Sequence, residues 1–439
     1  MIFYKARDRE TGNMWDTWAF FHGGTYHLFC LANSGDQGWD NISTATSPDG
    51  VHWTERGPIL RRRPTSIWMG TGSTWKSPRF DQDGRFLMNF SAAEGIGTRR
   101  QTIFFAESTD LVSWTRLGDE YEFTQDERWY EREGRWDCIF TIPRAGGGLY
   151  GYLTATPKGP GRFGFAQSDD GVRWEALPPP EADVVGNGEV GAVAHMAGRY
   201  YMMYGTGGSY VMLTLVAERP EGPFLPARRN YSLLSGHTYF TRFFESPDGM
   251  LISHHCMARD GEVYAAPFTR AVVDEEGTLR MCWWPGNENM KRSTVPLAAP
   301  EPSASPVLML KNAFDAAGGV ILEGTLALPA AGSASLTGLY IECGNGEAVA
   351  IAVSPDGSVQ VGPIRPDGTD FRPDKKADRE FAFGRQVRFR LLLEHSLLQF
   401  YLGDILMEGY SLPASATGHI GLLGNVTLLR AWRAASGPA

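Results

Sequence analysis

Three carboxylic acids occupy corresponding places in a repeated pattern of this 439-residue sequence, namely Asp16, Asp137 and Glu189. Each precedes a glycine-containing turn and a strand-like apolar segment by about ten residues. Acids at the same place in equivalent units face one another when the units pack around a common axis. Converging carboxylates suit the cleavage of a glycosidic bond, because one acid must protonate the leaving oxygen while another acts as nucleophile or activates water.

The third acid has a different use in such a site. It can raise the pKa of the other two by like-charge repulsion, or it can bind sugar hydroxyls. Neighbouring aromatic side chains could stack on sugar rings. The alternative is that the three acids form turns that line a solvated channel, and that Asp16 caps a turn.

Several residues near the acids are candidate substrate contacts because they offer an aromatic face or a hydrogen-bonding group. They are Trp15, Trp18, Asn33, Trp39, Asp40, Trp68, Ser73, Trp75, Lys76, Arg135, Trp136, Tyr239 and Arg242. Core packing is an equal expectation for Trp68, Trp75 and Trp136, and a plain turn is a strong alternative for Asp40. The histidines show no ligand spacing, so we expect neither a metal nor another cofactor.

A repeated unit positions these residues. The segment 42–53 recurs at 103–114 and at 163–174, each time as a strand, a Ser-x-Asp turn and a strand that holds a tryptophan. Weaker copies cover 213–224 and 263–268. An apolar strand precedes each copy, so the unit is expected to be a four-stranded antiparallel sheet. Five such units packed radially would form a five-bladed β-propeller.

The pattern changes toward the end of the chain. We expect the propeller in residues 1–295, a Pro-rich linker in 296–306 and a second domain in 307–439. The second domain lacks the tryptophan repeat, and its many short strands are typical of a β-sandwich. The predicted fold is therefore all-β, a five-bladed propeller followed by a β-sandwich.

Composition limits the partners. The formal net charge of −9 argues against nucleic acid and against an anionic membrane surface. No apolar run is long enough for a transmembrane helix, and the start of the chain lacks the apolar core of a signal peptide. The five cysteines are scattered, as expected of buried thiols in a reducing compartment. We therefore expect a cytoplasmic protein whose partner is a small carbohydrate substrate, and a homo-oligomer stays open.

Nearly the whole chain resembles glycoside hydrolase family 32, the invertase, inulinase and levanase group, and more loosely family 43. Asp16 and the segment 20–29, Phe-Phe-His-Gly-Gly-Thr-Tyr-His-Leu-Phe, resemble the stretch with the family's nucleophile. Asp137 lies where the family has its transition-state-stabilising aspartate, and Glu189 lies where it has the acid/base. The segment 387–404 resembles a strand pair of the family's C-terminal β-sandwich.

The sequence departs from that family's motifs around each acid. Trp15 replaces the asparagine before the nucleophile, and Thr-Trp-Ala at 17–19 replaces Pro-Asn-Gly. One extra residue separates Arg135 from Asp137, and Val190 replaces a cysteine. In the family these positions shape the fructose subsite, so the resemblance implies the fold more directly than the substrate.

The resemblance implies a retaining glycosidase that cleaves a fructofuranoside-like bond in a small oligosaccharide. Asp16 would be the nucleophile, Asp137 the stabiliser and Glu189 the general acid/base. Family 43 inverts, in which case Asp16 would be the base, and the separation of the carboxyl groups distinguishes the two outcomes. The alternatives are a transglycosylase or fructotransferase on the same scaffold, a carbohydrate-binding propeller with impaired catalysis, and, least favoured, a protein-interaction propeller.

Overall fold

The computed structural model describes residues 1–35, 38–94, 100–184, 188–206, 211–234, 237–298, 305–311, 314, 316–330, 336–376 and 386–434. These residues form antiparallel β-sheets, joined by short turns and one four-residue helix, α1 (Phe80–Asp83). The prediction of an all-β fold is confirmed. None of the described helices has the length and apolar character that crossing a lipid bilayer would require.

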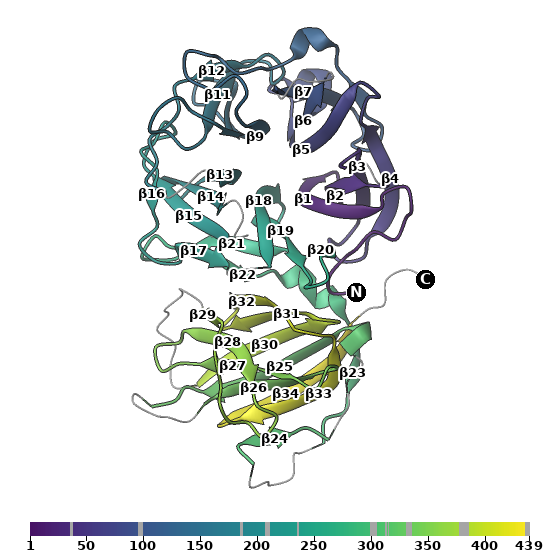
Figure 1. The fold of residues 1–439 in the computed structure, drawn as a ribbon, viewed down its shortest axis with the longest axis vertical. Coiled ribbons are helices and arrows are strands. Elements are labelled where there is room, and N and C mark those ends of the chain that lie inside the picture. Colours follow the sequence, from purple (N-terminus) through teal and green to yellow (C-terminus); the bar gives the residue numbers. More distant parts are fainter. Residues whose placement is uncertain are drawn as a thin grey trace.

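Five groups of strands, here called the N-terminal sheets, surround a common centre (Figure 1). The first two are β1 (Asn13–His22), β2 (Thr25–Asn33), β3 (Asn41–Ser47), β4 (Thr54–Arg61), and β5 (Ser66–Lys76), β6 (Phe86–Glu94), β7 (Gln101–Ser108), β8 (Thr115–Arg116). The next two are β9 (Trp136–Pro143), β10 (Leu149–Ala155), β11 (Gly164–Ser168), β12 (Glu175–Leu177), and β13 (Gly188–Met196), β14 (Arg199–Thr206), β15 (Val211–Ala217), β16 (Leu225–Pro226), β17 (Ser232–Leu234). The fifth is β18 (Thr238–Ser246), β19 (Gly249–Met257), β20 (Val263–Ala265), β21 (Thr269–Val273), β22 (Leu279–Trp283).

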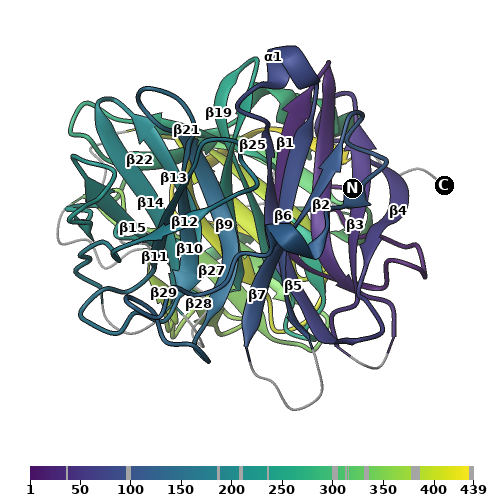
Figure 2. The same ribbon diagram turned by 90° about the horizontal axis from the view of Figure 1, so that it is seen from above.

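Within each group the first strand lies nearest the centre and later strands lie farther out (Figure 1). Seen from above, the long strands of these sheets run roughly alongside one another (Figure 2). The N-terminal segment joins the first and fifth groups, because Tyr4 exchanges backbone hydrogen bonds with Ala265 at 2.9 and 2.8 Å.

Side chains build the predicted turn of the repeat. Ser47 Oγ accepts the Gly50 N–H at 2.8 Å, and Asp49 Oδ1 accepts the next two N–H groups at 3.0 and 2.9 Å. Ser108 with Asp110, and Ser168 with Asp170, make the same bonds. The repeated tryptophans each lie one residue before the outer strand rather than within it; they are Trp53, Trp114 and Trp174.

The remaining strands form two C-terminal sheets that enclose a second apolar core. They are β23 (Lys291–Val295), β24 (Val307–Met309), β25 (Val320–Ala327), β26 (Gly338–Cys343), β27 (Ala348–Val353), β28 (Val359–Ile364), β29 (Lys375–Lys376), β30 (Gln386–Glu394), β31 (Leu397–Leu402), β32 (Ile405–Ser411), β33 (Ala416–Leu423) and β34 (Val426–Ala434). Strand β23 lies inside the predicted first domain but pairs with β34. Of the predicted linker 296–306, residues 299–304 lie outside the described residues. The domain limits therefore stay a prediction.

One C-terminal sheet packs against the fifth N-terminal group. Strands β22 and β32 pair through a single residue pair, Cys282 with Ile405. Ile321 and Leu392 of the C-terminal sheet belong to the same apolar cluster as Trp283 of the fifth group. A hydrogen bond of 2.8 Å between Gln399 and His254 crosses the same contact. Through this contact the C-terminal sheet covers the side of the fifth group that lies away from the centre and from β18, its first strand.

Candidate active site

A β-bulge or register irregularity interrupts the first strand of every N-terminal sheet close to a predicted site residue. The irregularities fall between Trp15 and Thr17, between Met69 and Gly72, between Asp137 and Phe140 (opposite Tyr152 and Thr154), between Val190 and Ala192, and between Tyr239 and Arg242. Three residues at these places have positive φ angles of 36, 53 and 52°, namely Asp16, Cys138 and Phe240. Because bulges re-aim side chains and occur often beside active sites, these five irregularities together mark the centre as a site.

Asp16 is the most isolated acid of the centre. It is 6% exposed, and its Oδ1 atom has no hydrogen-bond partner in the described part of the chain. Burial raises its pKa well above the usual range, and the nearby charges of Glu189 and Asp137 raise it further. Arg242 and Arg135 act in the opposite direction without cancelling the effect. Burial and the neighbouring acids therefore disfavour the ionised form of this carboxyl group.

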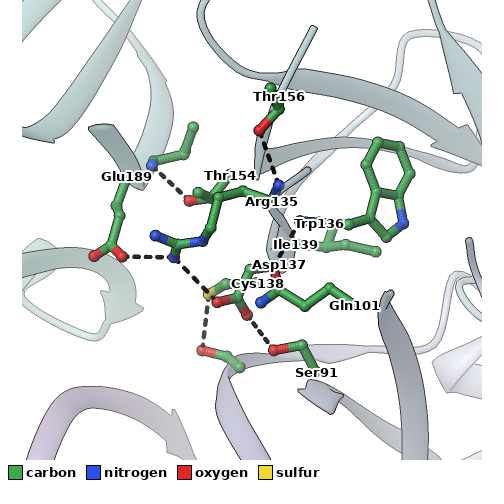
Figure 3. Close-up of polar contacts among 12 residues, drawn as sticks. Ser91, Gln101, Arg135, Trp136, Asp137, Cys138, Ile139, Thr154, Thr156 and Glu189 are labelled. Carbon is green, nitrogen blue, oxygen red and sulfur yellow. Dashed lines mark hydrogen bonds and ion pairs between the residues drawn. The ribbon is translucent and has the colours of Figure 1, made fainter. Parts of the chain in front are cut away.

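Arg135 joins the other two acids (Figure 3). Its Nη2 atom donates to Glu189 Oε1 at 2.6 Å and to Asp137 Oδ2 at 3.3 Å. Ser91 Oγ donates to Asp137 Oδ1, and the Tyr239 hydroxyl donates to Glu189 Oε2 at 3.0 Å. Burial raises the pKa of Asp137, although Arg135 and Ser91 oppose the shift. Both acids are thus held in fixed positions by donors from neighbouring sheets.

A buried cation lies behind the acids. Arg242 is 1% exposed, donates to the carbonyl of Gly191 and to Cys138 Sγ, and stacks 4.0 Å above the Phe240 ring. Burial raises the pKa of the Cys138 thiol to about 12, so the thiol stays protonated at neutral pH. Arg242 therefore compensates negative charge at the centre while its two terminal nitrogens donate to the protein and its Nε atom has no partner among the described residues.

Several aromatic rings lie close to one another beside the acids. Trp15 stacks on Trp39 with ring centroids 6.0 Å apart and lies 5.0 Å from His255, which is 6.0 Å from Tyr239. Trp15 and Trp39 are half-buried, so they retain surface for a ligand. Half-buried Trp68 lies across Gly70 from Asp137 and so belongs to the same site.

Other predicted contacts lie away from the acids. Trp18, Trp75 and Trp136 are core residues; the Trp18 and Trp136 rings donate at 3.0 Å to Thr74 Oγ1 and to the Phe123 carbonyl, respectively. Trp136 directly precedes Asp137 in a strand, so its side chain lies on the opposite face of the sheet from Asp137. Trp18 follows Asp16 by two residues and would share its face in a regular strand. The bulge at Asp16 reverses that alternation, so Trp18 faces away from Asp16.

The polar contacts that miss the centre have local structural partners. Ser73 donates to the Ile139 carbonyl and thereby ties β5 to β9. Lys76 lies at the far end of β5, 4.9 Å above the Phe80 ring. Asp40 accepts two hydrogen bonds from Ser34 and Asn33 accepts one from Gly35, so both acceptors shape one turn. For these four residues a sugar contact stays a prediction.

The centre also contains residues that the sequence analysis did not assign to it. Ser91 holds Asp137, Gly70 lies against the same carboxyl group, and Cys138 binds Arg242. His255 is buried, and neither of its ring nitrogens has a hydrogen-bond partner among the described residues. Gly70 and Gly72 lie two residues apart, and this spacing could have indicated a close approach of the backbone to the site. Nothing in the sequence distinguishes Ser91 from other strand serines.

Comparison with known proteins supports the fold. No protein-family model and no curated protein matches the sequence. Among solved structures, fructan 1-exohydrolase IIa from Cichorium intybus matches with a TM-score of 0.75 at 14% identity, covering 99% of this chain and 97% of that one. The Bombyx mori GH32 β-fructofuranosidase BmSUC1 matches with a TM-score of 0.70 at 15% identity, covering 98% and 93%.

A third solved structure, sucrose-6-phosphate hydrolase from Lactobacillus gasseri, matches with a TM-score of 0.70 at 15% identity, covering 97% of this chain and 91% of that one. The three matches extend over both the N-terminal and the C-terminal sheets. The expected resemblance to family 32 is confirmed at the level of the fold.

Proposed function

We propose that the protein is a glycosidase that cleaves a fructofuranoside-like bond in a small carbohydrate, with a five-bladed propeller carrying the site and a β-sandwich behind it. The observation that supports this most is the gathering of Asp16, Asp137 and Glu189 at the bulged first strands of three different sheets. Solved enzymes of the same fold act on fructans and on sucrose 6-phosphate according to their names.

Asp16 is proposed as the nucleophile of a retaining reaction. Its buried Oδ1 atom has no hydrogen-bond partner among the described residues that attack on the anomeric carbon would have to break, while Asp137 would stabilise positive charge on the sugar ring. The raised pKa disfavours the ionised carboxylate that attack requires. An incoming substrate whose hydroxyls donate to Asp16 supplies the hydrogen bonds that favour the ionised form.

Glu189 is proposed as the general acid. Its carboxylate oxygens accept hydrogen bonds from Arg135 and Tyr239, whereas an acid must hold a proton for the leaving oxygen. Arg135 must therefore release Glu189 when the substrate binds. Its side chain is half exposed, so it can swing toward the leaving group without unpacking the core.

The same hydrogen bonds favour a second candidate function, a carbohydrate-binding protein with impaired catalysis. If Arg135 stayed hydrogen-bonded to Glu189 in the sugar complex, Glu189 could not serve the leaving group as an acid. Calorimetric binding of a sugar without product over days would support this candidate over the first.

The test is a rate measurement on a panel of furanosides and fructans, with Asp16→Asn, Glu189→Gln and the exposed control Asp169→Asn. We expect the parent and the control to release sugar from at least one substrate. Each site variant should lower kcat by about 10³-fold or more while remaining folded. Near-parent rates in both site variants would refute the assignment.

A further inference from the structure

A second site lies on the C-terminal sheets. Strands β25, β30 and β34 pair side by side, and a cavity of about 460 Å³ opens on one face of their sheet. This volume falls in the ~300–1,000 Å³ range of small-molecule sites. Five charged residues line the cavity: Glu323, Arg388, Arg390, Asp404 and Arg430.

The strand register explains why these charges gather. Glu323 is directly opposite Arg390 on one neighbouring strand and opposite Arg430 on the other. Arg388 lies two residues before Arg390 in β30 and therefore projects from the same face. Ile321 lies two residues before Glu323 in β25, so it projects from the same face, and it packs against the N-terminal sheets. This face of the sheet is thus apolar where the N-terminal sheets cover it and charged where they no longer do.

Some of these charges neutralise one another. Arg390 donates to Glu323 Oε1 at 2.7 Å and to Asp404 Oδ1 at 3.0 Å, and it stacks 3.8 Å above the Trp283 ring. Glu323 also accepts a hydrogen bond from Lys291 at 2.7 Å. These contacts fix Arg390 and both carboxylates as the wall of the cavity.

Two arginines are not neutralised in this way. Arg388 and Arg430 are exposed, and within the part of the chain that the structure describes neither guanidinium group forms a hydrogen bond or an ion pair. Glu323 lies opposite Arg430 but is already engaged by Lys291 and Arg390. A pair of unpaired guanidinium groups in one cavity is notable in a chain with a formal net charge of −9.

We propose that this cavity binds a small ligand carrying an oxyanion, a phosphate ester or a carboxylate, between Arg388 and Arg430. A guanidinium group presents a planar fork of donors that matches the two oxygens of either anion. The fixed Arg390 ion pairs restrict the ligand to the two open arginines. The site lies on the other part of the molecule from the three acids and does not depend on the function proposed for them.

Titration calorimetry at low salt with inorganic phosphate tests the proposal. We expect saturable binding by the parent protein with a dissociation constant of about 1 mM or tighter. Arg388→Gln and Arg430→Gln should each weaken binding about tenfold, because each removes one charge-assisted contact. Arg433→Gln, an exposed arginine on the same strand as Arg430 but outside the cavity, is the matched control and should bind as the parent does.

Further titrations distinguish the sources of the anion. Stronger binding of glucose 6-phosphate identifies a phosphate ester, stronger binding of glucuronate identifies a carboxylate, and either result supports the proposal. Absence of saturable binding by all three anions would overturn it. An equal loss in Arg433→Gln, or equally tight binding of uncharged glucose, would also overturn it, because the two cavity arginines would then not recognise the anion.

Discussion

Arg135 is the residue on which the proposed chemistry most depends, since it contacts two of the three acids from a single nitrogen. Its spacing from Asp137 explains this. Two residues apart in an extended segment, both side chains project to the same side. The extra residue that separates this chain from the family 32 motif thereby places a cation between Asp137 and Glu189.

Replacing Arg135 should change the pH dependence of activity. Arg135 lowers the pKa of Asp137, so Arg135→Gln should let that pKa rise further. Because Asp137 must be ionised to stabilise the transition state, the acidic limb of kcat/KM should move to higher pH. Arg135→Lys keeps the charge and should move the limb less. An unchanged limb in the glutamine variant would contradict this role.

Asp16 should weaken the fold at neutral pH. Its folded-state pKa is raised above the unfolded value, so the folded protein binds more protons and loses stability as the pH rises above about 4. Asp16→Asn removes that penalty. We expect its free energy of unfolding at pH 7 to exceed that of the parent by about 1–3 kcal/mol, and the gain to shrink toward pH 4. Urea unfolding at both pH values measures this, and a variant less stable than the parent at pH 7 would contradict it.

At the scale of elements, the bulges of the first strands decide which side chains reach the centre. The sequence repeat was sufficient to predict the sheets and to relate Asp16, Asp137 and Glu189. It could not locate the bulges, since a one-residue slip depends on pairing between strands and not on local pattern. That is why Trp18 was expected at the site and lies in the core.

Gly70 shows how closely the second sheet approaches the acids. A Cβ atom there would overlap Ser91 Oγ, lie 2.8 Å from the Trp68 ring and lie 3.2 Å from Asp137 Oδ1. Gly70→Ala should therefore displace Ser91 and lower kcat about tenfold or more, with about 1–3 kcal/mol lost from the free energy of unfolding. Gly159→Ala has no atom within 4 Å of the added carbon and is the matched control. Parent-like kinetics in Gly70→Ala would show that Ser91 does not position Asp137.

At the scale of the whole molecule, the N-terminal segment ties the two sets of sheets together. Glu394 of β30 is buried, and its Oε2 atom accepts the backbone N–H groups of Ile2 and Phe3, both at 2.9 Å. Tyr4 in turn pairs with Ala265 of the fifth group. Packing of this kind connects residues hundreds of positions apart, so the alternation of single strands gave no sign of it.

Glu394→Ala should leave those two amides without acceptors and destabilise the molecule. We expect a loss of about 2–4 kcal/mol in the free energy of unfolding, because the acceptor is charged and buried. Glu347→Ala, exposed in a turn of the C-terminal sheets, is the control and should stay within about 0.5 kcal/mol of the parent. Equal stability of the two variants would show that the N-terminal segment contributes nothing to the contact.

The central claim is that Asp16 attacks a sugar, and the most direct measurement is the intact mass of the protein quenched during turnover. With an activated aryl furanoside and Glu189→Gln, which slows release of the intermediate, we predict the added mass of one glycosyl unit on the peptide containing Asp16. Asp16→Asn should show no adduct. Sugar release without any adduct, or an adduct on another residue, would contradict the account.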